Sequence, residues 1–238
     1  MSNLNTTREQ YIEKLLENYR LVSVLADKND CKVLRLRHKQ LNRDLVLRSF
    51  QKVVAAYEIL CGISTENLPE IYDAITLDDG QIVLEEFISG MTVADVMKGG
   101  NYRYRGAKRV LTSVCNALDI LHKNNIVHRD IKPENIIISD DGRVVLIDLN
   151  ISRKVTTNTK DTVIMGTVGY ASPEQLGVTG SDARTDIYAM GVLLNVMLTG
   201  KHPSETLAHG RSGKIVKKCT DISPDNRYQT SKKLIEAL

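Results

Sequence analysis

The sequence predicts an α+β protein whose first part is mainly sheet and whose second part is mainly helical. In residues 32–37, Leu34 and Leu36 alternate with Arg35 and Arg37, as in a half-buried strand. From residue 93 onward, apolar side chains instead recur at steps of three and four, which is typical of one helix face. That stripe consists of Val110, Val114, Ala117, Leu118 and Leu121.

The first part can be divided into elements in chain order. Thr6 followed by Glu9 resembles a capping box, which predicts a short helix that runs to Asn18. Short runs of apolar and β-branched residues then predict strands, and a turn at residues 78–80 leads into the last of them. The expected strands are residues 21–25, 32–37, 45–48 and 81–85, with a helix over residues 50–60.

The second part contains a predicted hairpin. Residues 135–139 and 144–148 are rich in β-branched residues, and the segment between them contains two aspartates and a glycine. If Ser139 pairs with Val144, then Asn135 lies opposite Asp148. Their amide and carboxylate oxygens are hard ligands of the kind that Mg²⁺ takes when it is shared with a nucleotide.

Two more polar residues precede this hairpin. Asp130 lies in a loop, where it could accept the proton of an incoming hydroxyl group. Lys132 would offer a positive charge to a phosphoryl group in transfer. The residues therefore favour phosphoryl-transfer chemistry.

Composition agrees with a folded domain and excludes several other classes. A chain of 238 residues with 42% hydrophobic content can bury a large core. The net charge of +3 is spread along the chain, so no nucleic-acid surface is expected. Residues 189–198 form the longest apolar stretch, which is too short to span a membrane, and residues 1–19 are too polar for a signal peptide.

The cysteines and histidines suggest no metal site. The four cysteines lack ligand or disulfide spacing, so we expect free thiols, which suit a reducing cytoplasm. We expect four of the histidines to be surface or packing residues. The residues in question are Cys31, Cys61, Cys115 and Cys219, and His38, His122, His202 and His209.

Five motifs occur in the order found in one known family. HRDIKPEN, residues 128–135, resembles the catalytic loop of the eukaryotic-type serine/threonine protein kinases, and Asp148-Leu149-Asn150 stands where that family has Asp-Phe-Gly. GTVGYASPEQ (residues 166–175), DIYAMG (186–191) and DNRYQT (225–230) resemble three later kinase segments. The short spacing between Arg48 and Glu58 is similar to that of compact kinases from Gram-positive bacteria.

The resemblance implies a bilobal protein-kinase fold. A helical extension would cover residues 1–18, a small lobe with an antiparallel sheet and one main helix residues 19–87, and a larger helical lobe residues 88–238, shortened at its C-terminal end. The implied cofactors are ATP and Mg²⁺, and the implied partner is a protein substrate with a serine or threonine acceptor.

The family pattern also assigns roles in the larger lobe. Asp130, Lys132 and Asn135 would be catalytic, and Asn135 and Asp148 would hold the metal. Thr167 would bond Asp130 and Lys132. Three residues would be structural: Glu174 paired with Arg227, and Asp186 near the start of a long buried helix.

The small lobe departs from the family. Ala26, Lys28 and Cys31 stand where the phosphate-covering loop has three glycines, which normally let backbone amides approach phosphate closely. Lys28 could replace lost amide contacts with charge. Arg48 replaces the nucleotide-anchoring lysine, and strand alternation places it on the same face as Val46. Its planar guanidinium is larger and differently aimed than an ammonium group.

The remaining nucleotide contacts are implied by alignment. Glu58 is either the partner of Arg48 or a solvated helix residue. Glu85 aligns with the gatekeeper, the residue before the hinge, but a one-residue slip would give that place to Leu84. The implied nucleotide-binding set is Arg48, Val33, Val46, Lys28, Glu58, Ile137 and the backbone of Glu86 and Ile88.

Regulation is implied by the middle of the chain. Kinases with an arginine before the catalytic aspartate order their activation loop by pairing it with a phosphorylated residue. Arg129 is that arginine, and a dimer would allow phosphorylation in trans. The available threonines are Thr156, Thr157, Thr159 and Thr162, and the alternative is a merely polar loop.

Two function classes follow. The first is an active serine/threonine kinase, with activity reduced by the altered phosphate loop and by Arg48. The second is a pseudokinase that keeps the fold as a regulatory or scaffold module. A small-molecule phosphotransferase is a third alternative, which acceptor tests would separate.

Overall fold

The chain folds into two compact units. The computed structural model describes residues 6–28, 30–155, 167, 169–176 and 180–238. The N-terminal unit lies within residues 1–65 and 69–88, and the C-terminal unit comprises residues 66–68 and 89–238. The α+β class and the small antiparallel sheet predicted from the sequence are confirmed.

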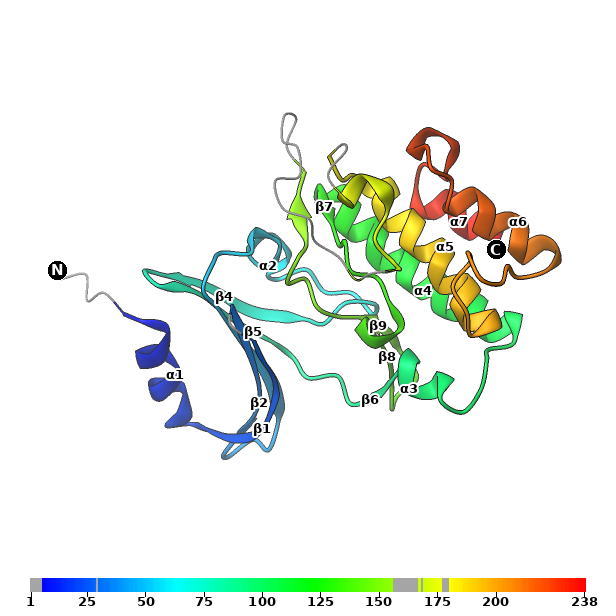
Figure 1. The fold of residues 1–238 in the computed structure, drawn as a ribbon. Helices are drawn as coiled ribbons and strands as arrows, with labels where there is room; N and C mark the ends of the chain where they lie inside the picture. Colours follow the sequence, from blue (N-terminus) through cyan, green and yellow to red (C-terminus); the bar gives the residue numbers. More distant parts are fainter. Residues whose placement is uncertain (1–5, 29, 156–166, 168, 177–179) are drawn as a thin grey trace. The chain divides into compact units, whose positions relative to one another are not determined.

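The N-terminal unit is built on a five-stranded antiparallel sheet in the order β1-β2-β3-β5-β4 (Figure 1). Alternation along the strands gathers leucine and isoleucine side chains on one face, where they are buried. This leucine face consists of Leu34, Leu36, Leu45, Leu47, Ile82 and Leu84. The strands are β1 (Tyr19–Lys28), β2 (Cys31–His38), β3 (Asp44–Phe50), β4 (Ile71–Leu77) and β5 (Gly80–Glu86).

Helix α1 (Arg8–Leu16) covers the leucine face, and Figure 1 shows it alongside the sheet. The helix starts one residue later than predicted. Thr7 is its N-cap, since the Thr7 hydroxyl accepts from Gln10 N–H at 3.3 Å and the Gln10 side chain accepts from Thr7 N–H at 3.1 Å. The capping box is therefore Thr7 with Gln10, and not Thr6 with Glu9. The side chains of α1 that pack on the sheet are Tyr11, Ile12, Leu15 and Leu16.

We expect α1 to contribute to the stability of the N-terminal unit. Ile12 and Leu15 are partly buried against the leucine face. Their joint replacement by alanine should lower the free energy of unfolding by about 2 kcal/mol. Urea unfolding would measure this, with the exposed Glu13→Ala as the matched control. An unchanged midpoint in the double variant would show that α1 is not part of this core.

Two further elements of the N-terminal unit differ from the prediction. Helix α2 (Ala55–Leu60) is shorter than the expected 50–60 because Phe50 continues β3 and pairs with Gln81. The Gln81 side chain then accepts from Val54 N–H at 2.9 Å, just before the helix. Strand β4 was not predicted, since its mixture of polar and apolar residues does not alternate cleanly.

The C-terminal unit is mostly helical, as predicted. Its long helix α4 buries the whole expected apolar stripe, and α5 is buried around most of its circumference. Figure 1 shows these two helices side by side, with α6 and α7 next to them. The helices are α3 (Val93–Met97), α4 (Tyr104–Lys123), α5 (Ala183–Thr199), α6 (Gly210–Cys219) and α7 (Ser231–Ala237), with short 3₁₀ turns η1 (Pro133–Asn135), η2 (Pro173–Leu176) and η3 (Pro224–Asn226). In the described part of the chain, we find no helix with the length and apolar character that a membrane crossing requires.

The predicted hairpin is formed by β8 (Ile136–Ser139) and β9 (Val144–Leu146), but its register was wrong by one residue. Ile138 pairs with Val144, and Ser139 N–H donates to Arg143 O at 2.9 Å. Gly142 has a positive φ of 89°, which closes a three-residue loop after Ser139. Asn135 therefore faces Ile147, whose N–H donates to Asn135 O at 2.9 Å, and not Asp148.

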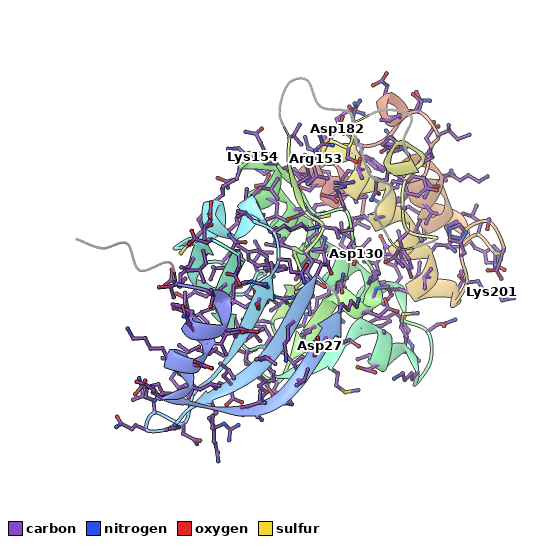
Figure 2. The ribbon with its side chains drawn as sticks, turned by 60° about the vertical axis from the view of Figure 1, so that its left-hand side comes forward. Asp27, Asp130, Arg153, Lys154, Asp182 and Lys201 are labelled. Carbon is purple, nitrogen blue, oxygen red and sulfur yellow. The ribbon has the colours of Figure 1, made fainter. Side chains whose placement is uncertain are left out.

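Three shorter strands complete the C-terminal unit. Strand β6 (Gly90–Thr92) pairs with β8, and β7 (Ile126–Val127) pairs with β10 (Arg153–Lys154). Because β7 directly precedes the loop that holds Asp130, the β7 and β10 pair ties that loop to the segment after Asp148. Figure 2 labels Asp130 and both residues of β10.

Candidate active site

The loop after β7 is held by a buried neutral histidine. The pKa of His128 is lowered by burial, although the carboxylates of Asp186, Asp148 and Asp130 act in the opposite direction. In its neutral form, His128 can accept from Asp130 N–H at Nδ1 (3.3 Å) and donate from Nε2 to Ile147 O (3.3 Å). One ring therefore links the backbone of Asp130 to the residue before Asp148.

Asp130 is the centre of a compact polar cluster. Its carboxylate accepts from Lys132 Nζ and from Asn135 Nδ2, both at 2.8 Å, and from the Thr167 hydroxyl at 2.6 Å. Lys132 also donates to the Thr167 hydroxyl at 2.8 Å. The two bonds implied for Thr167 are thus present, and the three residues predicted to be catalytic lie together.

These contacts keep Asp130 ionised. Burial raises the pKa of Asp130, but the hydrogen bonds from Lys132, Thr167 and Asn135 outweigh it, so the pKa lies below its usual value. Asn135 also donates to Asp130 O at 2.8 Å, which fixes the backbone as well as the carboxylate. The arrangement provides an oriented carboxylate that can accept a proton, beside an ammonium group.

Of the two predicted metal ligands, Asn135 belongs to this cluster and Asp148 lies near His128. Asp148 has a positive φ of 72°, and its carboxylate accepts from Asn150 N–H at 3.2 Å. Although it does not face Asn135 in the hairpin, it lies near enough to His128 to affect that ring's pKa. Among the residues described, no group of three His, Cys, Asp or Glu side chains is placed to hold a metal ion. One carboxylate and one amide oxygen fit a Mg²⁺ ion that takes its other ligands from water and phosphate.

Asp186 holds the backbone of the loop that carries Asp130. It is fully buried in the first turn of α5, and it accepts from His128 N–H at 3.0 Å and from Arg129 N–H at 2.9 Å. Its third contact is with His122 Nε2 at 2.8 Å. We expected His122 to be a surface or packing residue, but it is a polar partner here because the end of α4 meets the start of α5. No motif in the sequence marks this contact.

A buried ion pair links η2 to the segment before α7. Arg227 donates two hydrogen bonds to Glu174, at 2.6 and 2.9 Å, and both side chains are at most 5% exposed. Thr185 donates to the same carboxylate at 3.0 Å. Burial raises the pKa of Glu174, but the hydrogen bonds from Arg227 lower it by more, so the pKa lies below its usual value. The pairing implied by the resemblance is confirmed.

The backbone of Arg129 is bonded both to Asp186 of α5 and to Gln175 of η2. Arg129 is buried and has a positive φ of 71°, and its carbonyl accepts from the Gln175 side chain at 3.0 Å. The threonines that we expected to pair with it, Thr156, Thr157, Thr159 and Thr162, lie outside the described residues.

In the N-terminal unit, Arg48 has a different partner from the one predicted. Arg48 Nε donates to Glu85 Oε1 at 2.6 Å, and the two side chains are 7% and 5% exposed. Glu58 is exposed on α2 and instead accepts from Thr76 at 2.6 Å and from Gln81 at 3.3 Å. Of the two alternatives for Glu58, the pair with Arg48 is not formed because Glu58 turns toward β4 and β5, and the exposed helix residue agrees with the structure.

The sheet register separates the two gatekeeper alternatives. Val46 lies opposite Glu85, so Glu85 shares the face of Arg48, whereas Leu84 belongs to the leucine face. Val33 lies opposite Arg48 in the β2 and β3 pair, on that same face. One face of the sheet in the N-terminal unit thus carries the buried side chains of Val33, Val46, Arg48 and Glu85.

The other nucleotide candidates are distributed over both units. Lys28 is exposed at the end of β1 and pairs with Cys31, and Glu86 N–H donates to Glu70 O at 2.8 Å. Ile88 is buried at the end of the N-terminal unit. Ile137 is half-buried on β8 of the C-terminal unit, opposite Val145.

Comparison with known families decides what these sites belong to. Residues 23–238 match the model of the protein kinase domain. The chain belongs to the protein kinase family. The kinase resemblance that the five motifs carried is therefore confirmed over most of the chain.

Several curated relatives of this kinase domain are bacterial, as predicted. A Clostridium perfringens protein named as a probable serine/threonine-protein kinase is 30% identical over 220 residues, covering 82% of this chain and 32% of its own length. PknB of Bifidobacterium longum, also a probable serine/threonine-protein kinase, is 34% identical over 176 residues, 68% of this chain and 25% of its own. The serine/threonine-protein kinase PknB of Mycobacterium tuberculosis is 32% identical over 177 residues, which cover 63% of this chain and 28% of its own length. The chain spans about a third or less of the length of these relatives.

Proposed function

We propose that this domain transfers the γ-phosphoryl group of ATP to serine or threonine hydroxyl groups of a protein substrate. The observation that carries the proposal is the cluster of Asp130 with Lys132, Asn135 and Thr167. A carboxylate held ionised by these donors can take a proton from a hydroxyl group. The family membership and the names of the relatives support the same activity.

In the proposed step, Asp130 accepts the proton of the acceptor hydroxyl as its oxygen bonds to the γ-phosphorus. The bond from that phosphorus to the ADP oxygen breaks, and ADP leaves. Lys132, beside Asp130 at 2.8 Å, would stabilise charge on the transferred group. Bound Mg²⁺, held by Asn135 and Asp148, would neutralise charge on the phosphate oxygens.

We assign the nucleotide contacts of the N-terminal unit to Arg48, Val33 and Val46, with Lys28, Glu86 and Ile88 from the same unit. In the C-terminal unit, the family pattern assigns Ile137 to the nucleotide. Support comes from the shared face of the first three and from the family pattern. Use of ATP and the free thiols of the chain favour a cytoplasmic location.

A coupled assay of ADP formation with a protein acceptor tests the proposal. We expect ADP formation to require Mg²⁺ and ATP, and to continue over many turnovers only when the acceptor is also present. Binding of ATP without any turnover would favour the alternative, a pseudokinase that acts as a regulatory or scaffold module. That alternative is supported by Ala26, Lys28 and Cys31 in place of glycines. Turnover with small molecules alone would favour a small-molecule phosphotransferase.

The role of Thr167 gives a pH prediction. Its hydroxyl donates to Asp130 and helps to hold the pKa of that carboxyl below its usual value. Thr167→Val removes this donor, so the pKa of Asp130 should rise. The acidic limb of the pH profile of kcat/KM should then move to higher pH, because the carboxylate of Asp130 becomes protonated at a higher pH. Thr167→Ser keeps the hydroxyl and should keep the wild-type profile; equal profiles for all three proteins would contradict this role.

We further propose that the domain phosphorylates its own threonines after β10, at Thr156, Thr157, Thr159 or Thr162, and that Arg129 pairs with the added phosphate. Mass spectrometry after incubation with Mg²⁺ and ATP should find phosphate on this segment. The same incubation with Asp130→Asn is the control. Phosphate on neither protein would argue against this regulation, as would equal phosphate on both.

A further inference from the structure

The sheet supplies a carboxylate partner for Arg48. Arg48 Nε and Glu85 Oε1 are 2.6 Å apart, and both side chains are more than nine-tenths buried. In the register of β3 and β5, Arg48 lies opposite Val83, and Glu85 is two residues further along the same face. The two side chains are therefore diagonal neighbours, which is a distance that long side chains can bridge.

Both residues stand on strands that are bonded on each side. Strand β3 lies between β2 and β5, and β5 lies between β3 and β4. Next to Glu85, the backbone N–H of Glu86 donates to Glu70 O at 2.8 Å. A charged pair carried by two internal strands is held more precisely than one carried by a loop.

Glu58, the carboxylate of helix α2, does not contact Arg48. Glu58 is exposed, and its Oε1 accepts from Thr76 and Gln81. Helix α2 has only six residues and begins after Val54. Of the two acidic side chains, Glu85 on β5 contacts Arg48, whereas Glu58 on α2 contacts Thr76 and Gln81.

The chemistry of arginine suits this arrangement. A guanidinium is a planar fork that can bond a carboxylate through Nε and bond an anion through its terminal nitrogens, whereas an ammonium group is a single point charge. Arginine at position 48 and glutamate at position 85 thus act as a matched pair.

We propose that Glu85 is the positioning residue that aims Arg48 at the nucleotide phosphates. The proposal rests on the proposed function, since it assumes that ATP binds beside Arg48. Glu85 itself does not touch the reacting atoms, and it acts through the orientation of the guanidinium.

The test compares Glu85→Gln with the wild type in calorimetric titrations of ATP with Mg²⁺ and, separately, of adenosine. Because only ATP carries phosphates, Glu85→Gln should weaken ATP binding by about tenfold or more and change adenosine binding by less than about twofold. Glu70→Gln, an exposed glutamate beside β5, is the matched control and should leave both affinities unchanged. Glu58→Gln tests the helix carboxylate in the same way.

Three results would overturn the proposal: equal ATP binding by Glu85→Gln and the wild type, equal loss of ATP and adenosine affinity, or a selective loss in Glu58→Gln alone. If Glu85→Gln does not fold, Glu85→Asp keeps the charge and shortens the side chain by one methylene group. It should still weaken ATP selectively, and wild-type ATP affinity would refute the positioning role. Failure of the wild type to bind ATP would instead refute the proposed function.

Discussion

Asp130→Asn is expected to lower kcat for phosphoryl transfer by about 10²–10⁴-fold, the usual contribution of a general base. The amide cannot take the proton of the acceptor hydroxyl, although it keeps the size of the carboxylate. Its neighbours Lys132, Asn135 and Thr167 would lose a charged acceptor but would remain in place. The affinity for ATP should therefore change little, so that the loss falls on kcat.

The measurement is a steady-state rate with saturating ATP, together with a separate titration of nucleotide binding. Asp119→Asn is a suitable control, because Asp119 lies on α4 and forms ion pairs with the surface lysines Lys123 and Lys232. It should keep the wild-type rate. If Asp130→Asn retains more than about a tenth of the rate, the carboxylate is not the base.

Arg227→Met is expected to lower the free energy of unfolding of the C-terminal unit by about 3–5 kcal/mol. The change leaves Glu174, which is 5% exposed, as a buried carboxylate without its bidentate partner. It also removes the donor to Asp221 O at 2.8 Å. Thermal or urea unfolding followed by circular dichroism would measure the loss.

A double variant separates the ion pair from simple packing. Replacing both members of a buried pair with apolar side chains is often close to neutral. Arg227→Met combined with Glu174→Met should therefore recover much of the stability lost in the single variant. Equal stability of Arg227→Met and the wild type would show that this pair does not hold η2 against the end of the domain.

The catalytic loop could be predicted because its chemistry is local in sequence. Asp130, Lys132 and Asn135 lie within six consecutive residues, so one loop can bring their side chains together. The structure brings them together as expected, and Thr167 joins them. The pair of Glu174 with Arg227 joins distant residues, and it was predicted only through the family resemblance.

The errors arose where contacts depend on register or on packing between elements. The predicted register of the β8 and β9 hairpin was wrong by one residue because Gly142 closes a three-residue loop. Composition alone does not specify the length of that loop. The two alternatives for Glu58 were left open because the direction of a helix side chain depends on where the helix docks. The contact of His122 with Asp186 has the same origin, since it requires the end of α4 to meet α5.

The most direct test of the account is to identify the amino acid that receives the γ-phosphoryl group. The domain is incubated with γ-labelled ATP, Mg²⁺ and a protein acceptor, and the labelled protein is hydrolysed for phosphoamino acid analysis. We predict label on phosphoserine or phosphothreonine with the wild type, and at least about a hundredfold slower labelling with Asp130→Asn. Absence of label with the wild type, or equal label with both proteins, would contradict the proposed kinase activity and its base.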